Sequence, residues 1–355
     1  MTVNYKMLTL AREARGYTQK ELTNAISMQS QGNYSRMEKG ILPIPTELIK
    51  QIAEELKFPE SFFYREEPLV SQAEYFYRKK ASMPKKELYK LEATFDLIRM
   101  WFNSLLKEVD LPEFKFPEVS TRNGQTPEII AQKTRAFINA PKGPLDDLIR
   151  IFEKNGVIVY FLPNAPETFD GTTIITESNQ KVLVVNAEMP NYRKRFTIAH
   201  ELGHMVMHIP FGSYIEEVID VENEANRFAS EFLMPENEIR RDLLYITYGK
   251  LSDLKQYWKA SKSSLIVRAN ALGTIHKGKY INMLNELSRF DERRVEKSDV
   301  YLDEPALFKK IIKVFNTDMG YTLEELYEVL GLDKEDFERF IIGNDIRVKR
   351  LRISI

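Results

Sequence analysis

The sequence contains no cysteine among its 355 residues. A disulfide framework and a metal site built from thiolates are therefore both excluded, and the composition agrees with a protein of the reducing cytoplasm. Long apolar runs are missing as well. No stretch of about 18 apolar residues exists that could cross a membrane, and the first residues lack the apolar core of a secretory signal. We therefore expect a cytoplasmic protein with no membrane partner.

The chain also has almost no net charge. Its 51 lysines and arginines are balanced by 52 aspartates and glutamates, which gives a formal charge of −1. No overall electrostatic field draws such a chain to nucleic acid, so any DNA-binding surface must be local. The length is enough for two or three domains of about 100–200 residues each.

Histidine is scarce and unevenly distributed. The chain has only four histidines, and three of them lie within residues 200–208. Two belong to the sequence His200-Glu-Leu-Gly-His204, an HExxH pattern. Residues i and i+4 of a helix lie on one face, about 5.4 Å apart, so both imidazoles can bind the same zinc ion. Glu201 can then act as general base toward a zinc-bound water. The alternative is a core helix whose histidines make ordinary hydrogen bonds.

The residues around this pattern favour the metal site over the core helix. Several of them are apolar and predict a buried helix: Ile198, Ala199, Leu202, Met205 and Met207. Burying a charged glutamate between two histidines is costly unless the group has a partner or a function. The pattern therefore predicts a zinc site in which His200 and His204 are ligands and Glu201 is catalytic.

A catalytic zinc site needs a third protein ligand. His208 follows the first histidine of the pattern by eight positions, which is about 12 Å along a continuous helix. That is too far for one shared ion, so we expect His208 to pack beside the site or orient a ligand. A carboxylate from the amphipathic segment 221–235 is the better candidate. Glu224 adjoins its apolar face, whereas Glu222 and Glu231 fall toward solvent. The alternative for Glu224 is a solvated surface charge.

Residues 4–65 are predicted to form short helices. Thr18 can cap the second of them, and Glu21 three residues later completes a capping box. Ser30 can begin the next helix, which ends at Gly40. The segment resembles helix-turn-helix domains of the XRE type, which includes Cro and lambda repressor. The matching pieces are Arg15-Gly-Tyr-Thr-Gln-Lys-Glu-Leu22 and Tyr34-Ser-Arg-Met-Glu-Lys-Gly40.

The XRE resemblance implies that DNA is a partner of the chain. In such domains the second helix of the motif enters the major groove. The residues that would face base edges or phosphates are Gln19, Gln31, Asn33, Arg36 and Lys39. The turn between the two helices is one residue longer than is usual in the family, and Gly32 lies in the recognition helix. The alternative is a helical protein-interaction module, which includes a dimerisation domain and leaves a homodimer open.

The rest of the chain predicts a mostly helical α+β protein. A helical connector is expected over 66–125, with one long helix from 85 to 109, and a zincin-like domain over 126–250. Strands are expected at 157–162, 169–175 and 181–186, and we expect them to form a small antiparallel sheet that leads into the His200 helix. Zinc proteases hold an extended peptide against the edge strand of such a sheet. Residues 251–355 are expected to be helical.

The central region also resembles the ImmA/IrrE family of HExxH metallopeptidases. The resemblance covers roughly 145–275. It rests on Phe196-Thr-Ile-Ala-His-Glu-Leu-Gly-His204, on His208, and on Glu224-Ala-Asn-Arg-Phe-Ala229 leading to Leu233-Met-Pro235. The family commonly joins this domain to an XRE domain.

What the ImmA/IrrE resemblance implies is a gluzincin-like endopeptidase. Its zinc would be held by His200, His204 and Glu224, with Glu201 as base. The implied substrate is a protein, often a DNA-binding repressor. The alternative function is a transcriptional regulator or antitoxin without proteolysis, whose zinc domain only senses or holds shape. An intact Glu201 favours the enzyme, because a structural zinc site does not need it.

Overall fold

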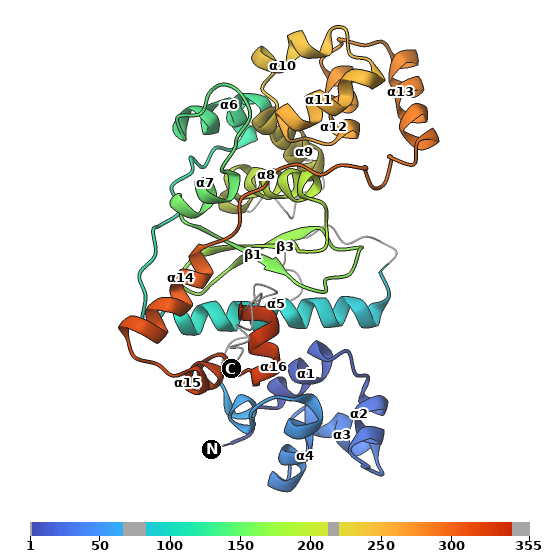
Figure 1. Ribbon diagram of the computed structural model, residues 1–355. Coiled ribbons are helices and arrows are strands. Elements are labelled where there is room, and N and C mark those ends of the chain that lie inside the picture. Colours follow the sequence, from blue (N-terminus) through green and yellow to red (C-terminus); the bar gives the residue numbers. More distant parts are fainter. Residues whose placement is uncertain (1, 67–82, 212–219, 343–355) are drawn as a thin grey trace, which may run out of the picture.

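The computed structural model describes residues 2–66, 83–211 and 220–342. Figure 1 shows a mostly helical α+β protein built in layers. The N-terminal helices lie at one end, followed by the long helix α5, a small sheet, the helices α8 and α9, and a further group of helices at the opposite end. Part of the expected connector, 67–82, and the last residues of the expected C-terminal region, 343–355, lie outside the described residues.

The N-terminal helices are short, as expected, and the second and third of them begin at the predicted caps. They are α1 (Tyr5–Ala14), α2 (Gln19–Ala25), α3 (Gln31–Glu38), α4 (Thr46–Leu56) and a 3-10 turn (Glu60–Tyr64). At the start of α2, the backbone N–H of Glu21 donates to the Thr18 hydroxyl over 3.2 Å, and the backbone N–H of Thr18 donates to the Glu21 carboxylate over 2.7 Å. At the start of α3, the Ser30 hydroxyl accepts from the backbone N–H of Asn33. These bonds confirm the capping box and the second cap.

The sheet is mixed, so the expectation of an antiparallel sheet is wrong for one of its two pairings. Its strands are β1 (Val157–Leu162), β2 (Gly171–Ile175) and β3 (Lys181–Asn186), in the order β1-β3-β2. β2 and β3 form the expected antiparallel pair, whereas β1 is parallel to β3. The reason is that connection 163–170 crosses the end of β3. The amide of Asn186 holds it by donating to the carbonyls of Pro166 and Phe169 over 3.1 and 2.9 Å.

Side chains of the strands alternate between two cores, as a period of two residues requires. One face of the sheet carries Ile158, Tyr160, Leu162, Ile174, Val182 and Val184 into a core shared with α5 (Lys85–Leu105) and the N-terminal helices. The other face carries Val157, Val159, Leu183 and Val185 into a core shared with α8 (Asn191–Met207) and α9 (Val221–Leu233). The sheet thus separates the N-terminal helices from the histidine helix.

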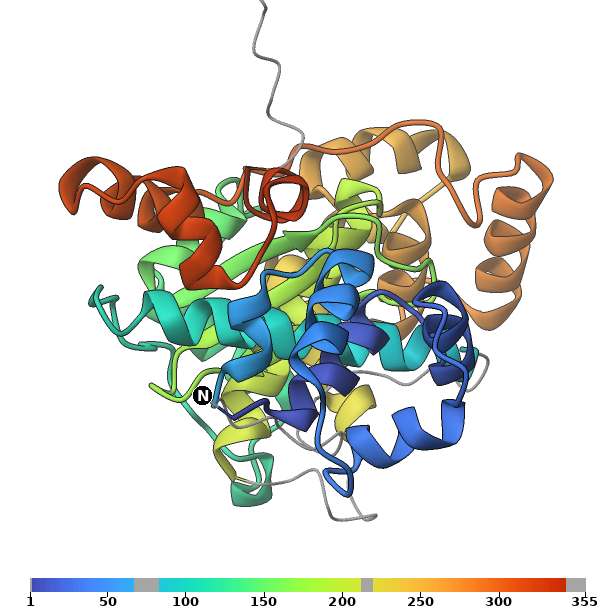
Figure 2. The same ribbon diagram turned by 90° about the horizontal axis from the view of Figure 1, so that it is seen from below.

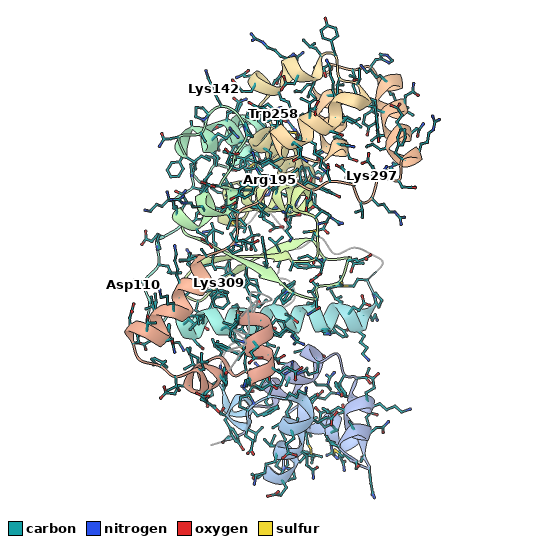
Figure 3. The ribbon with its side chains drawn as sticks, in the orientation of Figure 1. Asp110, Lys142, Arg195, Trp258, Lys297 and Lys309 are labelled. Carbon is teal, nitrogen blue, oxygen red and sulfur yellow. The ribbon has the colours of Figure 1, made fainter. Side chains whose placement is uncertain are left out.

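Further helices complete the second core around α8 and α9. They are α6 (Pro127–Phe137), α7 (Leu148–Lys154), α10 (Glu236–Leu243), α11 (Tyr248–Trp258), α12 (Lys262–Ala271) and α13 (Lys277–Arg289). Figure 3 labels two side chains that tie these helices together. Arg195 of α8 donates to the carbonyls of Leu145 and Lys259, and the indole of Trp258 donates to Asp242 over 3.0 Å.

The expected helical region 251–355 is divided between the two cores. Its first helices, α11 to α13, pack with α8, whereas α14 (Leu307–Lys313), α15 (Leu323–Leu330) and α16 (Lys334–Phe337) return to α5 and the N-terminal helices. Figure 2 shows this return from below. Ion pairs join Arg15 to Asp336 at 2.5 Å and Lys57 to Glu335 at 2.7 Å. Within the described ranges, no helix is both long and apolar enough to cross a membrane.

Candidate metal centre

The close packing of α8 against α9 positions the candidate metal centre, and Gly203 permits it. A Cβ atom at Gly203 would stand 3.2 Å from the Cα atom of Ala225 and 3.2 Å from the ring of Phe228. Both distances are tighter than ordinary van der Waals contact, so the absence of a side chain lets the two helices approach closely. Gly203 lies directly before His204, and the first turn of α9 therefore reaches the histidines of α8.

The two HExxH histidines face each other at the centre of this contact. The Nε2 atoms of His200 and His204 lie 3.0 Å apart. Two ligand nitrogens at about 2.0–2.1 Å from one tetrahedral zinc stand about 3.3 Å apart, so the pair fits a shared ion. The carboxylate of Glu222 lies 3.6 Å from Nε2 of His200 and 3.5 Å from Nε2 of His204. Ligand atoms of the three side chains all lie within 4.8 Å of one another, so the donor set is compatible with zinc.

Glu224 occupies a different position, beside His208. Its Oε2 atom lies 3.1 Å from Nε2 of His208 and accepts a hydrogen bond from the hydroxyl of Thr121 over 3.0 Å. His208 in turn places its Nδ1 atom 2.9 Å from Nδ1 of His204. A chain of contacts thus runs from Thr121 through Glu224 and His208 to His204. The assignment of Glu224 as the third zinc ligand stays a prediction, beside the candidate group that contains Glu222.

His208 lies at the C-terminal end of the HExxH helix. The helix continues past His204 and ends at Met207, so His208 is the residue that caps it. Burial first and the neighbouring His204 second lower the pKa of His208 to about 4, although the contact with Glu224 opposes this shift. A neutral imidazole in this position can donate one ring N–H and accept at the other nitrogen. It therefore suits an orienting contact to His204.

Glu201 is held in the interior between α8 and the sheet. Its side chain accepts a hydrogen bond at Oε2 from the hydroxyl of Thr173 over 2.8 Å. Burial raises the pKa of Glu201 to about 7, whereas the charge of His204 and the Thr173 hydrogen bond lower it. Gly171 makes this contact possible, since a Cβ atom there would stand 2.6 Å from the Thr197 side chain. β2 can therefore lie directly against α8.

β2 is also an edge strand, which the sequence does not reveal. In the sheet order β1-β3-β2, β2 pairs only with β3 among the described residues. The strand that borders Glu201 is therefore one that a further extended segment can join by backbone hydrogen bonds.

Several residues of the site lack a signal of their own in the sequence. Thr173 and Thr121 lie in segments with no catalytic pattern, and Asn226, whose Oδ1 lies 3.1 Å from Nδ1 of His200, could be found only through the ImmA/IrrE resemblance. Metal-ligating histidines are commonly oriented by such contacts of the second ring nitrogen.

The expectation that Glu231 falls toward solvent is wrong. It is 1% exposed and paired with Arg268, because α12 covers this side of α9.

The residues predicted to bind DNA lie on α2, on α3 and at Lys39, directly after α3. Gln31, Asn33, Arg36 and Lys39 are exposed. The Gln31 amide donates to the Gln19 side chain over 3.0 Å, and Gln19 donates to Glu38 over 2.7 Å. Their role toward DNA stays a prediction.

Comparison with protein families gives a match for the central region. Residues 152–270 match the family described as the IrrE N-terminal-like domain, a peptidase family. No individual curated protein matches the chain significantly. The matched range contains the sheet, α8 and α9, and with them His200, Glu201, His204 and Glu222. Residues 152–270 of this chain therefore form an IrrE-like metallopeptidase domain, and a His-His-Glu group compatible with zinc lies in it.

Proposed function

We propose that the protein is a zinc-dependent endopeptidase that cleaves a protein substrate. The observation that carries this proposal is the position of Glu201. Its side chain is buried on the HExxH helix, its carboxylate is hydrogen-bonded to Thr173 of β2, and it lies near enough to His204 for that residue to lower the pKa that burial raises. A structural zinc site needs neither a buried glutamate that is not a ligand nor an open strand edge beside it.

Each group has a distinct role in the proposed hydrolysis. Zinc, when bound, supplies an activated water and polarises a carbonyl. Glu201 accepts a proton and passes it toward the leaving amine. The Thr173 hydroxyl holds Oε2 of Glu201 in place, and within the described residues no hydrogen bond occupies Oε1. The edge of β2 aligns the substrate chain by backbone pairing. The ImmA/IrrE resemblance favours a transcriptional repressor as substrate.

Removing the metal tests this proposal. Incubation of a cell extract with the zinc-loaded protein should produce new protein N-termini, detected by mass spectrometry of terminal peptides. Treatment with a chelator should abolish them, and added zinc should restore them. Extract without the protein is the control. If the same termini appear with chelated protein, they arise from another peptidase and the proposal fails.

We further propose that the N-terminal helices bind DNA. The support is the exposed set of polar side chains on α3 and the capped start of α2 beside it. A helix that enters the major groove reads bases with its first residues, while neighbouring cations contact phosphates.

Two variants test the DNA-binding proposal. Lys39→Ala should weaken binding to all duplexes alike, because it removes a phosphate contact. Gln31→Ala should mainly reduce discrimination between sequences. Gel retardation with a fragment from upstream of the gene and an unrelated fragment measures both effects. The absence of any retardation of wild-type protein at low salt would instead support a protein-interaction module.

A further inference from the structure

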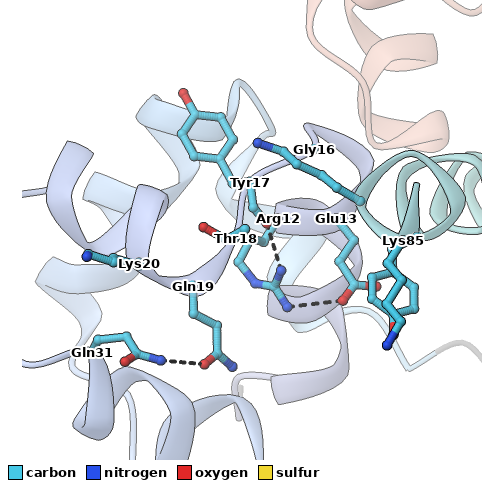
Figure 4. Close-up of a pocket in the computed structure, with 11 residues that line it drawn as sticks. Arg12, Glu13, Gly16, Tyr17, Thr18, Gln19, Lys20, Gln31 and Lys85 are labelled. Carbon is cyan, nitrogen blue, oxygen red and sulfur yellow. Dashed lines mark hydrogen bonds and ion pairs between the residues drawn. The ribbon is translucent and has the colours of Figure 1, made fainter.

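A hollow of about 520 Å³ opens where the start of α2 meets the start of α5 (Figure 4). Gln19, Lys20 and Gln31 line it from the N-terminal helices, and Lys85 and Lys86 line it from α5. We propose that this junction binds the phosphate backbone of duplex DNA, so that α5 extends the DNA-binding surface beyond α2 and α3. This inference rests on the DNA binding proposed above.

The basic end of α5 is fixed against α2. The ammonium of Lys86 pairs with both carboxylate oxygens of Glu21 at 2.7 and 2.8 Å. The lysine stems of α5 also pass over the turn at Gly16, where a Cβ atom would stand 3.4 Å from Cδ of Lys90. Because Glu21 belongs to the capping box of α2, the orientation of α5 is tied to the start of that helix.

The charges that line the hollow favour an anion. Four lining residues are cationic and one is acidic: Arg12, Lys20, Lys85, Lys86 and Glu13. Arg12 is nearly buried and already bound to Glu38 and Glu13, and Lys86 is bound to Glu21. Lys20 and Lys85 are exposed and form no ion pair within the described part of the chain. They are therefore the two cations available to a ligand.

The position of the hollow favours duplex DNA over an acidic peptide. Its wall includes Gln31, the first residue of α3, so an anion bound here lies next to the helix whose exposed side chains are predicted to face bases. The Gln19–Gln31 hydrogen bond makes the surface continuous between α2 and α3 (Figure 4). A DNA strand that follows α3 would carry its flanking phosphates past Lys20 and Lys85, and each neutralised phosphate would release counterions.

The test is the salt dependence of DNA binding by the full-length protein. Lys20→Gln and Lys85→Gln should each reduce the slope of log affinity against log salt by about 1, and the double variant by about 2, for any duplex sequence. Lys85→Arg should restore the slope. Lys107→Gln is the matched control, because Lys107 is an exposed lysine just beyond the opposite end of α5. Fluorescence anisotropy with a short labelled duplex gives the slopes.

The outcomes separate this inference from the DNA-binding proposal. If the wild-type protein binds DNA but Lys85→Gln and Lys107→Gln have the same slope of log affinity against log salt, the role of α5 is overturned and the DNA-binding proposal stands. A wild-type protein that binds no duplex at low salt overturns both the inference and the DNA-binding proposal.

Poly-glutamate serves as a second probe. If the two lysine variants lose affinity for it but keep their affinity for the duplex, the hollow is an acidic-peptide site and the inference is wrong.

Discussion

Glu201→Gln should lower the rate of peptide hydrolysis by about 10²- to 10⁴-fold, the usual contribution of a positioned general base. Zinc content and folding should stay nearly unchanged. The amide has the shape of the carboxylate, and its oxygen can still accept the Thr173 hydrogen bond at the site where Oε2 accepts it now. The amide, however, cannot take a proton from water as the carboxylate does. The loss should therefore appear in the chemical step. It is measured as the rate at which new N-termini form when the peptidase is in excess over its substrate.

A second glutamate of the same domain provides the control for this substitution. Glu167 is exposed on the connection between β1 and β2, so Glu167→Gln makes the same carboxylate-to-amide change away from the site and should cleave as wild type. Zinc analysis and circular dichroism should not distinguish the two variants. If Glu201→Gln with bound zinc still cleaves at the wild-type rate, the protein is not a peptidase of this type. A wild-type protein that binds zinc but produces no new N-termini would instead support a regulator whose zinc domain only senses or holds shape.

The helical part of the site could be predicted from the sequence because its geometry is local. Two histidines four residues apart must share a helix face, and the Nε2 atoms of His200 and His204 do converge. The caps at Thr18 and Ser30 were predictable for the same reason. Whether Gln31 and its neighbours contact DNA does not follow from a fold alone, because one fold serves many functions.

The long-range arrangement could not be predicted in the same way. A continuous apolar run such as 157–162 indicates a strand that is buried on both faces, but not which strand lies beside it. β1 joins β3 in parallel only because 163–170 crosses over and Asn186 holds it. The amphipathic helices after residue 251 likewise each require a core. Nothing in their pattern assigns α12 to the histidine helix and α15 to the N-terminal helices.

The carboxylates of α9 show a further limit of prediction from the sequence. Residues two positions apart on a helix point about 200° away from each other, which suggested that only Glu224 could face the histidines. Glu222, in the first turn of α9, nevertheless approaches both Nε2 atoms, while Glu224 contacts His208.

His200→Ala and His204→Ala should each empty the zinc site, because either change leaves too few ligands for a stable tetrahedral ion. His208→Ala should behave differently. His208 contacts the far ring nitrogen of His204, and loss of such an orienting partner typically weakens metal affinity about 10- to 100-fold. The protein should then still purify with zinc but release it to a weaker chelator. Stoichiometry by elemental analysis and competition with a fluorescent zinc chelator measure the two effects.

The same two measurements on Glu222→Gln and Glu224→Gln identify the carboxylate ligand. The structure places Glu222 at the histidine pair and Glu224 at His208, whereas the ImmA/IrrE resemblance implies Glu224. The variant of the true ligand should lose zinc outright, as the histidine variants do. The other should match the smaller loss of His208→Ala, because it would only remove a contact to a ligand or its partner. Equal, small losses in both variants would mean that neither glutamate binds the metal, and the gluzincin-like ligand set would be wrong.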